Sequence, residues 1–201
     1  MIRVECKFAA SIGRFELEDY VRPVEFSVLG YTVDGDEVVM GRIVGDQLRL
    51  IEAEIDEISL FDICDNDSGG MTDLFTALFD ENYNFHEEID PKMETDYILF
   101  LWNAALHPSL APYFSGIVET ISDMLGKHSA VVVRRGVCQL TDRQLADLGF
   151  GRIAGTEFLF RHMGMLSPYN KMYPQGDLVD SDYAVDADDG QWVLENWDDE
   201  V

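Results

Sequence analysis

The segment YILFLWNAAL at residues 97–106 restricts the possible folds most strongly, because it is almost continuously apolar. It falls well short of the ~18 apolar residues that a membrane helix needs. A run of this length is typical of a central β-strand whose two faces are both covered by other elements. The two prolines of HPSLAP, at residues 107–112, predict a loop directly after this strand.

The elements that follow alternate between helix and strand. Apolar residues at helical spacing predict a helix over 114–126, and SAVVV at 129–133 predicts a buried strand. A capping box at 141–144 begins a short helix that ends at Leu148-Gly149. The segment TEFLFRHM, at 156–163, predicts the closing strand.

The first half of the chain alternates apolar and polar residues, which predicts β-strands. Four strands are expected, at 2–8, 24–33, 37–44 and 47–54. Asp34-Gly35 and Gly45-Asp46 suit tight hairpin turns, since glycine and aspartate tolerate positive φ. We therefore expect the sheet to start as an antiparallel meander.

The pattern changes after residue 67. Helical spacing predicts a helix over 71–80 with Ser68 or Asp67 as its N-cap, and the polar segment 82–95 predicts a loop. Together the elements predict an α/β (α+β) fold with a mixed, mostly antiparallel central sheet flanked by helices. One domain is expected over residues 1–163, followed by an acidic C-terminal extension over 164–201.

The chain is strongly and unevenly acidic. It has 39 Asp and Glu against 14 Lys and Arg, a formal net charge of −25. Counted by segment, residues 1–100 carry −17, residues 101–176 carry +2 and residues 177–201 carry −10. Adaptation to high salt is one explanation, but it would spread acid over every exposed face. The near-neutral middle segment favours an interaction role for the acidity instead.

Charge and composition limit the functional classes. Such a surface repels phosphate backbones and anionic lipid, so we expect basic partners, with neither direct nucleic-acid binding nor membrane binding. Apolar residues make up 47% of the chain, enough for a folded core despite the charge. Cys6, Cys64 and Cys138 form no CxxC pair, which favours free thiols and a cytoplasmic location.

The acidic extension also contains apolar residues, including Trp192 and Trp197. A purely solubilising tail rarely contains two tryptophans. We expect part of the extension to dock on the domain, with 191–195 as a short strand.

Two segments of the second half carry a family resemblance. ILFLWNAALHPSLAPYFSGIVETISDML is similar to the central strand, cofactor loop and following helix of one family, and LADLGFGRIAGTEFLFRHM is similar to its closing elements. That family is the GNAT acyltransferases. The resemblance covers residues 97–163, whereas the first half matches the family's opening strands only loosely. It implies a GNAT-like fold and acetyl-CoA binding.

The sequence departs from the family where the chemistry is done. The family's cofactor loop follows the pattern Arg/Gln-x-x-Gly-x-Gly/Ala, in which x is any residue. Its backbone amides and its basic side chain bind the pyrophosphate of the cofactor. Here Ala111, Phe114 and Gly116 occupy those positions, and Ser115 lies between the last two. Leu145 replaces a tyrosine proposed as the general acid, and leucine cannot donate a proton. These four loop residues therefore form a degenerate acetyl-CoA loop, and we expect no cofactor and no catalysis by the family mechanism.

No metal site is expected. Asp62, Asp65 and Asp67 match half of a calcium loop, but the bidentate Glu of such a loop is missing, so we interpret them as a strand-to-helix turn with acidic capping. The four histidines lack metal-binding spacing and are interpreted as surface or loop residues. Arg134-Arg135 could grip an acidic ligand, although internal pairing with carboxylates is favoured.

The leading hypothesis is a catalytically degenerate GNAT-like protein whose acidic surface binds a basic or nucleic-acid-binding protein. In its specific form, the surface imitates the phosphates of DNA, about one charge per 1.7 Å of axis, as in anti-restriction and other anti-defence proteins. The candidate interface residues are Glu52, Glu54, Asp56, Glu57, Asp62, Asp65, Asp67, Asp180, Asp182, Asp186, Asp188 and Asp189.

The alternative is an acetyl-CoA-dependent N-acetyltransferase with a variant cofactor loop. In that case Asn103 or nearby strand carbonyls would place a basic amine substrate, and the acidic lining would attract it.

Overall fold

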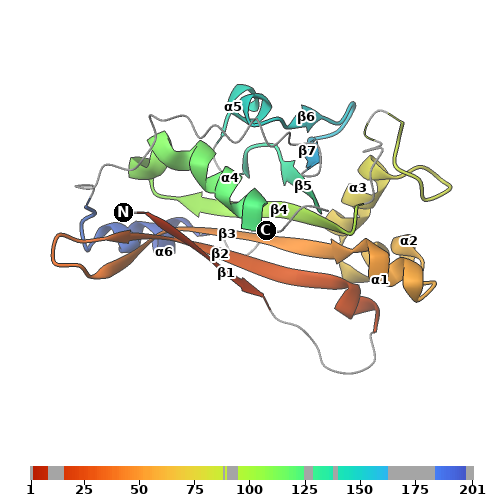
Figure 1. The fold of residues 1–201 in the computed structure, drawn as a ribbon, viewed down its shortest axis with the longest axis horizontal. Helices are drawn as coiled ribbons and strands as arrows, with labels where there is room; N and C mark the ends of the chain where they lie inside the picture. The colour runs from red at the N-terminus through yellow and green to blue at the C-terminus, as the bar shows by residue number, and fades with distance from the viewer. Residues whose placement is uncertain are drawn as a thin grey trace.

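The computed structural model of this chain describes residues 2–8, 16–87, 89, 95–124, 129–137, 140–162 and 184–197. These residues form one seven-stranded sheet in the order β1-β2-β3-β4-β5-β7-β6. Strands β4 and β5 pair in parallel, and every other neighbouring pair is antiparallel. Helices flank the sheet (Figure 1), so the predicted α+β class with a mixed, mostly antiparallel sheet is confirmed.

Strands β1 (Arg3–Phe8), β2 (Val21–Tyr31) and β3 (Glu37–Arg49) form the predicted antiparallel meander. A short 3-10 helix, η1 (Leu17–Tyr20), precedes β2. The β2–β3 hairpin turns at Asp34-Gly35, and Gly35 has the positive φ, 89°, that the turn requires.

The second predicted hairpin, at Gly45-Asp46, is wrong, because β3 runs straight through these residues. Gly45 serves a close approach between strands: it pairs with Leu101 of β4 (Tyr97–Leu106), and a Cβ atom at Gly45 would overlap the carbonyl oxygen of Phe100. The predicted strand 47–54 is therefore the end of β3 followed by helix α1 (Leu50–Ile55).

Strand β4 has the bounds that its apolar run predicted, and it pairs in parallel with β5 (Ser129–Arg134). Parallel neighbours need a crossover, and here it contains the predicted helix α4 (Phe114–Met124). The segment predicted as a loop after β4 is instead a 3-10 helix, η2 (Pro108–Tyr113). Proline is compatible with the first helical position, where its missing N–H costs no hydrogen bond.

Buried side chains form two clusters, which divide the residues of β4 between them. Leu99 packs in one cluster with side chains from α4 and from α5 (Asp142–Asp147), and Phe100 packs in the other with side chains from α2 (Leu60–Asp67) and α3 (Gly69–Leu78). Since successive strand residues point to opposite faces, β4 is covered on both faces.

Helices α1, α2 and α3 gather at one end of the sheet (Figure 1). Helix α3 matches the predicted helix but begins two residues earlier, with Ser68 Oγ accepting a hydrogen bond from the Met71 N–H. Helix α2 was not predicted. It begins at a second serine cap, Ser59, so the strand-to-helix turn expected at residues 62–67 is wrong.

The closing elements follow the sequence prediction. The capping box of Thr141 and Gln144 starts α5, and β7 (Phe158–His162) lies within the predicted strand 156–163. A two-residue strand, β6 (Gly151–Arg152), forms the edge of the sheet beside β7.

Residues 184–197 pack on β3, mainly through helix α6 (Asp189–Asn196). The short strand predicted at 191–195 is wrong. Strand β3 is interior, with its backbone already paired to β2 and β4, so a segment packed on it must satisfy its own backbone hydrogen bonds as a helix does. Val193 is buried, and the Trp197 ring lies 4.2 Å from the Arg42 guanidinium. The domain boundary expected at residues 163 and 164 lies outside the described residues.

Within the part of the chain that the structure describes, no helix is both long and apolar enough to cross a membrane.

Candidate functional site

The residues of the degenerate cofactor loop lie where η2 runs into α4. The chain stays helical through the junction, with Phe114 at φ −54° and ψ −43°. Phe114 is buried in the core, whereas Ala111 and Gly116 are exposed and Ser115 is half-buried. The first residue of α4 is thus a buried phenylalanine, at the position where the cofactor loop of the GNAT family has a glycine.

Leu145, at the position of the family's general acid, is buried in the core beside α4. Its side chain fills apolar space and can neither donate nor accept a proton. Two of the departures from the family motif, Phe114 and Leu145, are thus side chains of the packed interior.

A partly buried acid, Asp46, lies on β3 near the centre of the sheet. The register of β3 and β4 pairs Val44 with Asn103 and Gly45 with Leu101, which leaves Trp102 as the extra residue of a bulge. The Trp102 Nε1–H donates a 2.7 Å hydrogen bond to Asp46 Oδ2. Sequence reasoning missed this pair because it placed Asp46 in a turn.

The surroundings of Asp46 change its titration. Burial raises the pKa of Asp46 to about 6; the Trp102 hydrogen bond lowers it in part, and the charge of Asp67 raises it further. Burial also raises the pKa of the Asp67 carboxyl. The Asp67 carboxyl therefore binds its proton more tightly than a fully solvated aspartate does.

Six of the predicted interface acids are exposed at the α1–α2 end of the sheet. Asp67 is set apart from the other five, because burial raises the pKa of its carboxyl and its charge acts on Asp46. We call the other five the acidic surface: Glu54, Asp56, Glu57, Asp62 and Asp65. None of the five forms an ion pair with another described residue. Asp56 also accepts a 2.7 Å hydrogen bond from the Tyr20 hydroxyl, which ties the end of α1 to η1.

Glu52 does not belong to this surface. Its side chain is 21% exposed and forms an ion pair with Arg49 at 2.6 Å, and the Tyr97 hydroxyl lies 3.5 Å from the same oxygen. Its charge is therefore largely neutralised inside the molecule.

The predicted acids of the extension lie elsewhere. Helix α6 is at the opposite end of the sheet from α1 and α2 (Figure 1), so the two groups of acids are not one patch. Asp186 and Asp188 are exposed, but Asp189 turns back to accept a hydrogen bond from the Asp186 N–H and lies 3.7 Å from His107. Asp180 and Asp182 lie outside the described residues.

The arginines that follow β5 are paired internally, as the sequence favoured. Arg134 pairs with Glu157 at 2.8 Å, and Arg135 and Arg152 both pair with Asp142. The Arg135 hydrogen bond is the main cause that lowers the pKa of Asp142 to about 2.

Among the described residues, no group of three or more His, Cys, Asp or Glu side chains could hold an ion. The interpretation of all four histidines as surface or loop residues is wrong for His162, which is buried in β7 with its Nε2 2.6 Å from Thr95 Oγ1.

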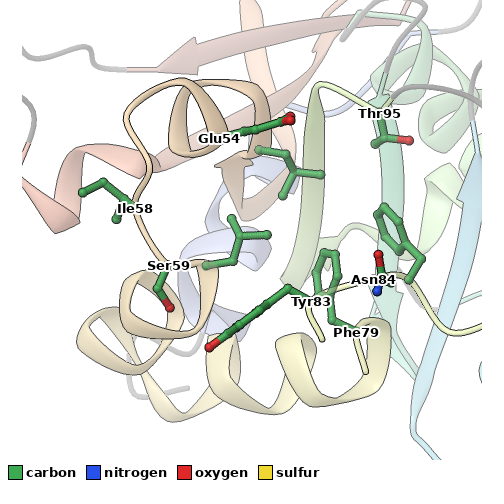
Figure 2. A pocket seen from close by; sticks show the side chains of 10 residues that line it. Glu54, Ile58, Ser59, Phe79, Tyr83, Asn84 and Thr95 are labelled. Carbon is green, nitrogen blue, oxygen red and sulfur yellow. The ribbon is translucent and has the colours of Figure 1, made fainter. Parts of the chain in front are cut away.

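An open cavity of about 550 Å³ lies between α1, the start of α2 and the segment 79–85 (Figure 2). Its walls combine aliphatic and aromatic side chains with a few polar groups. The lining residues are Leu50, Glu54, Ile58, Ser59, Leu60, Phe79, Tyr83, Asn84, Phe85 and Thr95. Sequence reasoning placed this region in a strand and a loop, so it predicted no cavity here.

One lining residue, Tyr83, has a strained backbone, with φ of 63°. Asp80 holds the turn: its Oδ1 accepts hydrogen bonds from the Asn82 N–H (2.8 Å) and the Asn84 N–H (3.0 Å). These backbone hydrogen bonds are the main cause that lowers the pKa of Asp80. The turn presents Tyr83 half-exposed at the cavity, with Phe75 behind it at a ring distance of 5.8 Å.

Compared with protein-family models, curated proteins and solved structures, this chain matches none of them.

Proposed function

We propose that this protein is a non-catalytic interaction module that binds a basic protein through its acidic surface. The observation that carries the proposal is the group of five exposed carboxylates at the α1–α2 end, none of them ion-paired with a described residue. A partner with a complementary basic surface would be attracted over several ångströms, because neighbouring unpaired charges of one sign add their fields.

The internal ion pairs support this assignment. Two arginines of β3 have carboxylate partners of their own: Arg49 pairs with Glu52, and Arg42 pairs with Glu25. The acidic surface thus keeps its negative charge instead of folding against neighbouring cations. The charge of these five carboxylates, out of a total net charge of −25, is therefore available to a partner.

We further propose that the chain is a GNAT-like protein that has lost its chemistry. The parallel β4–β5 pair inside an otherwise antiparallel sheet supports the family resemblance. The buried Phe114 and Leu145 support the loss of cofactor binding and acid catalysis. In the specific form of the proposal, the partner is a cytoplasmic nucleic-acid-binding protein and the carboxylates occupy its phosphate sites.

A charge-neutralised variant tests the interaction. The variant replaces the five acids of the acidic surface by Gln or Asn, and its matched control makes five such changes at the exposed Asp34, Asp36, Glu81, Glu87 and Asp147. Partners are isolated from the native host on the immobilised protein, and their affinities are measured with purified components. A specific partner should bind the control variant as tightly as it binds the unmodified protein, and it should not bind the neutralised variant. Its complex with the unmodified protein should dissociate when the salt concentration is raised from about 0.1 to about 0.5 M.

Equal loss with both variants, or binding that salt does not change, contradicts the proposal. Displacement of the partner by duplex DNA supports the DNA-mimic form. Calorimetry with acetyl-CoA tests the alternative acetyltransferase: micromolar binding would contradict the lost-cofactor reading and favour an enzyme that acts on a basic amine.

A further inference from the structure

The cavity beside α1 has the chemistry of a site for an organic cation. Three aromatic side chains, Phe79, Tyr83 and Phe85, form part of its wall, and Phe79 and Phe85 pack with ring centroids 4.6 Å apart. Glu54 is the charged residue among the described residues of the lining, and none of those described residues is basic. Figure 2 shows Glu54 projecting from α1 at one side of the cavity, and Tyr83 and Phe79 at the other side.

We propose that this cavity binds a small N-methylated ammonium group. Aromatic faces carry partial negative charge and attract cations, and they attract methylated ammonium groups well because such ions are weakly hydrated and offer apolar methyl surface. Glu54 supplies the counter-charge. The volume, about 550 Å³, lies within the range of about 300–1,000 Å³ that is common for small-molecule sites.

Other ligand classes fit the lining less well. An anion would meet the Glu54 carboxylate, and no positive side chain among the described lining residues would offset that charge. A metal ion needs several oxygen, nitrogen or sulfur ligands around one point, and the described residues contain no group of three such acidic, His or Cys side chains. A neutral apolar ligand would use the rings and leave the carboxylate without a partner.

The aromatic wall is prepared before a ligand arrives. The Asp80 hydrogen bonds hold Tyr83 in a left-handed conformation, and Phe75 stacks on Phe79 from behind at 5.2 Å. A prepared site loses less conformational entropy on binding than a flexible one does.

A pair of isosteric probes tests the proposal. Choline carries a trimethylammonium group, and 3,3-dimethylbutan-1-ol has the same shape with a neutral carbon in place of the nitrogen. Each is titrated into the full chain and followed by NMR chemical shifts and calorimetry. We expect choline to bind on the order of tenfold more tightly than the alcohol.

Two charge variants separate the site from general attraction. Glu54→Gln should weaken choline about tenfold and leave the alcohol unchanged. Glu57→Gln removes an equal charge from the same end of the molecule, outside the cavity lining, and should change choline binding less than about twofold. Glu57 belongs to the acidic surface, so this variant can weaken a protein partner while choline binding persists.

Several results would overturn the proposal: equal affinity for choline and the alcohol, equal weakening by the two variants, or no choline binding at concentrations up to about 10 mM. Tyr83→Leu, with unfolding temperature measured to confirm folding, should also weaken choline. A capped trimethyl-lysine distinguishes the source of the group: tighter binding than choline indicates the side chain of a protein, and weaker binding indicates a free small molecule.

Discussion

Replacing the partly buried Asp46 by Asn should stabilise the protein at neutral pH. The pKa of Asp46 is about 6 in the folded protein, against an ordinary value of 3.8. The folded state therefore binds this proton more tightly than the unfolded chain does, and stability falls as pH rises between these two values. At about 1.36 kcal/mol per pH unit, the ionised carboxylate costs about 3 kcal/mol above pH 7. Asn removes that cost, and its Oδ1 can still accept the Trp102 hydrogen bond.

Urea unfolding followed by circular dichroism measures the effect between pH 5 and pH 7.5, above the sequence pI of about 4.1. The advantage of Asp46→Asn should grow from about 1.5 kcal/mol at pH 5 to about 3 kcal/mol at pH 7.5. Asp34→Asn, at an exposed turn, removes the same charge and corrects for general repulsion in an acidic protein. An advantage no larger than that of Asp34→Asn, or one that does not change with pH, would show that Asp46 titrates normally.

Three further substitutions, two of them with a comparison variant, test the packing. Gly45→Ala should destabilise the protein by about 3 kcal/mol in urea unfolding, because its methyl group meets the backbone of β4, whereas Gly116→Ala, in open space on α4, should be neutral or slightly stabilising. Glu119→Gln should lower the free energy of unfolding by about 1–3 kcal/mol, because the Arg161 side chain, 2% exposed, then lacks its carboxylate partner. Arg161→Met should leave the free energy of unfolding nearly unchanged, and an equal loss for both variants would contradict this account. Val193→Ala should lower the free energy of unfolding by about 1.5 kcal/mol, because Val193 is buried. Its amide hydrogens in α6 should exchange faster than those of the rest of the chain, and a uniform increase in exchange would contradict separate docking of that helix.

Elements governed by local pattern were predictable from the sequence. The apolar run gave β4 its bounds, and the Thr141 capping box placed α5. In both cases the residues that define the element lie within it, so no distant contact was needed.

The errors occurred where a distant contact decides the structure. Gly45-Asp46 has the local signature of a turn, but the closeness of the β4 backbone and the Trp102 hydrogen bond keep it within β3. Residues 191–195 have the local signature of a strand, but their position over an interior strand favours a helix.

The candidate sites divide in the same way. Substitutions in the cofactor loop could be seen in the sequence, because each position is compared with a fixed motif. The cavity beside α1 could not, because Glu54, Tyr83 and Phe85 come from segments that only the fold brings together.

The docking of α6 on β3 also sets an order of events during synthesis. The β3 residues beneath α6, among them Arg42, leave the ribosome about 150 residues before Trp197, which covers its guanidinium in the finished protein. Until then this part of the sheet face is open to solvent or to a chaperone. Because the contact joins residues so distant in sequence, its closure entropy makes it a late folding step, and the finished face exists only once the acidic extension has been made.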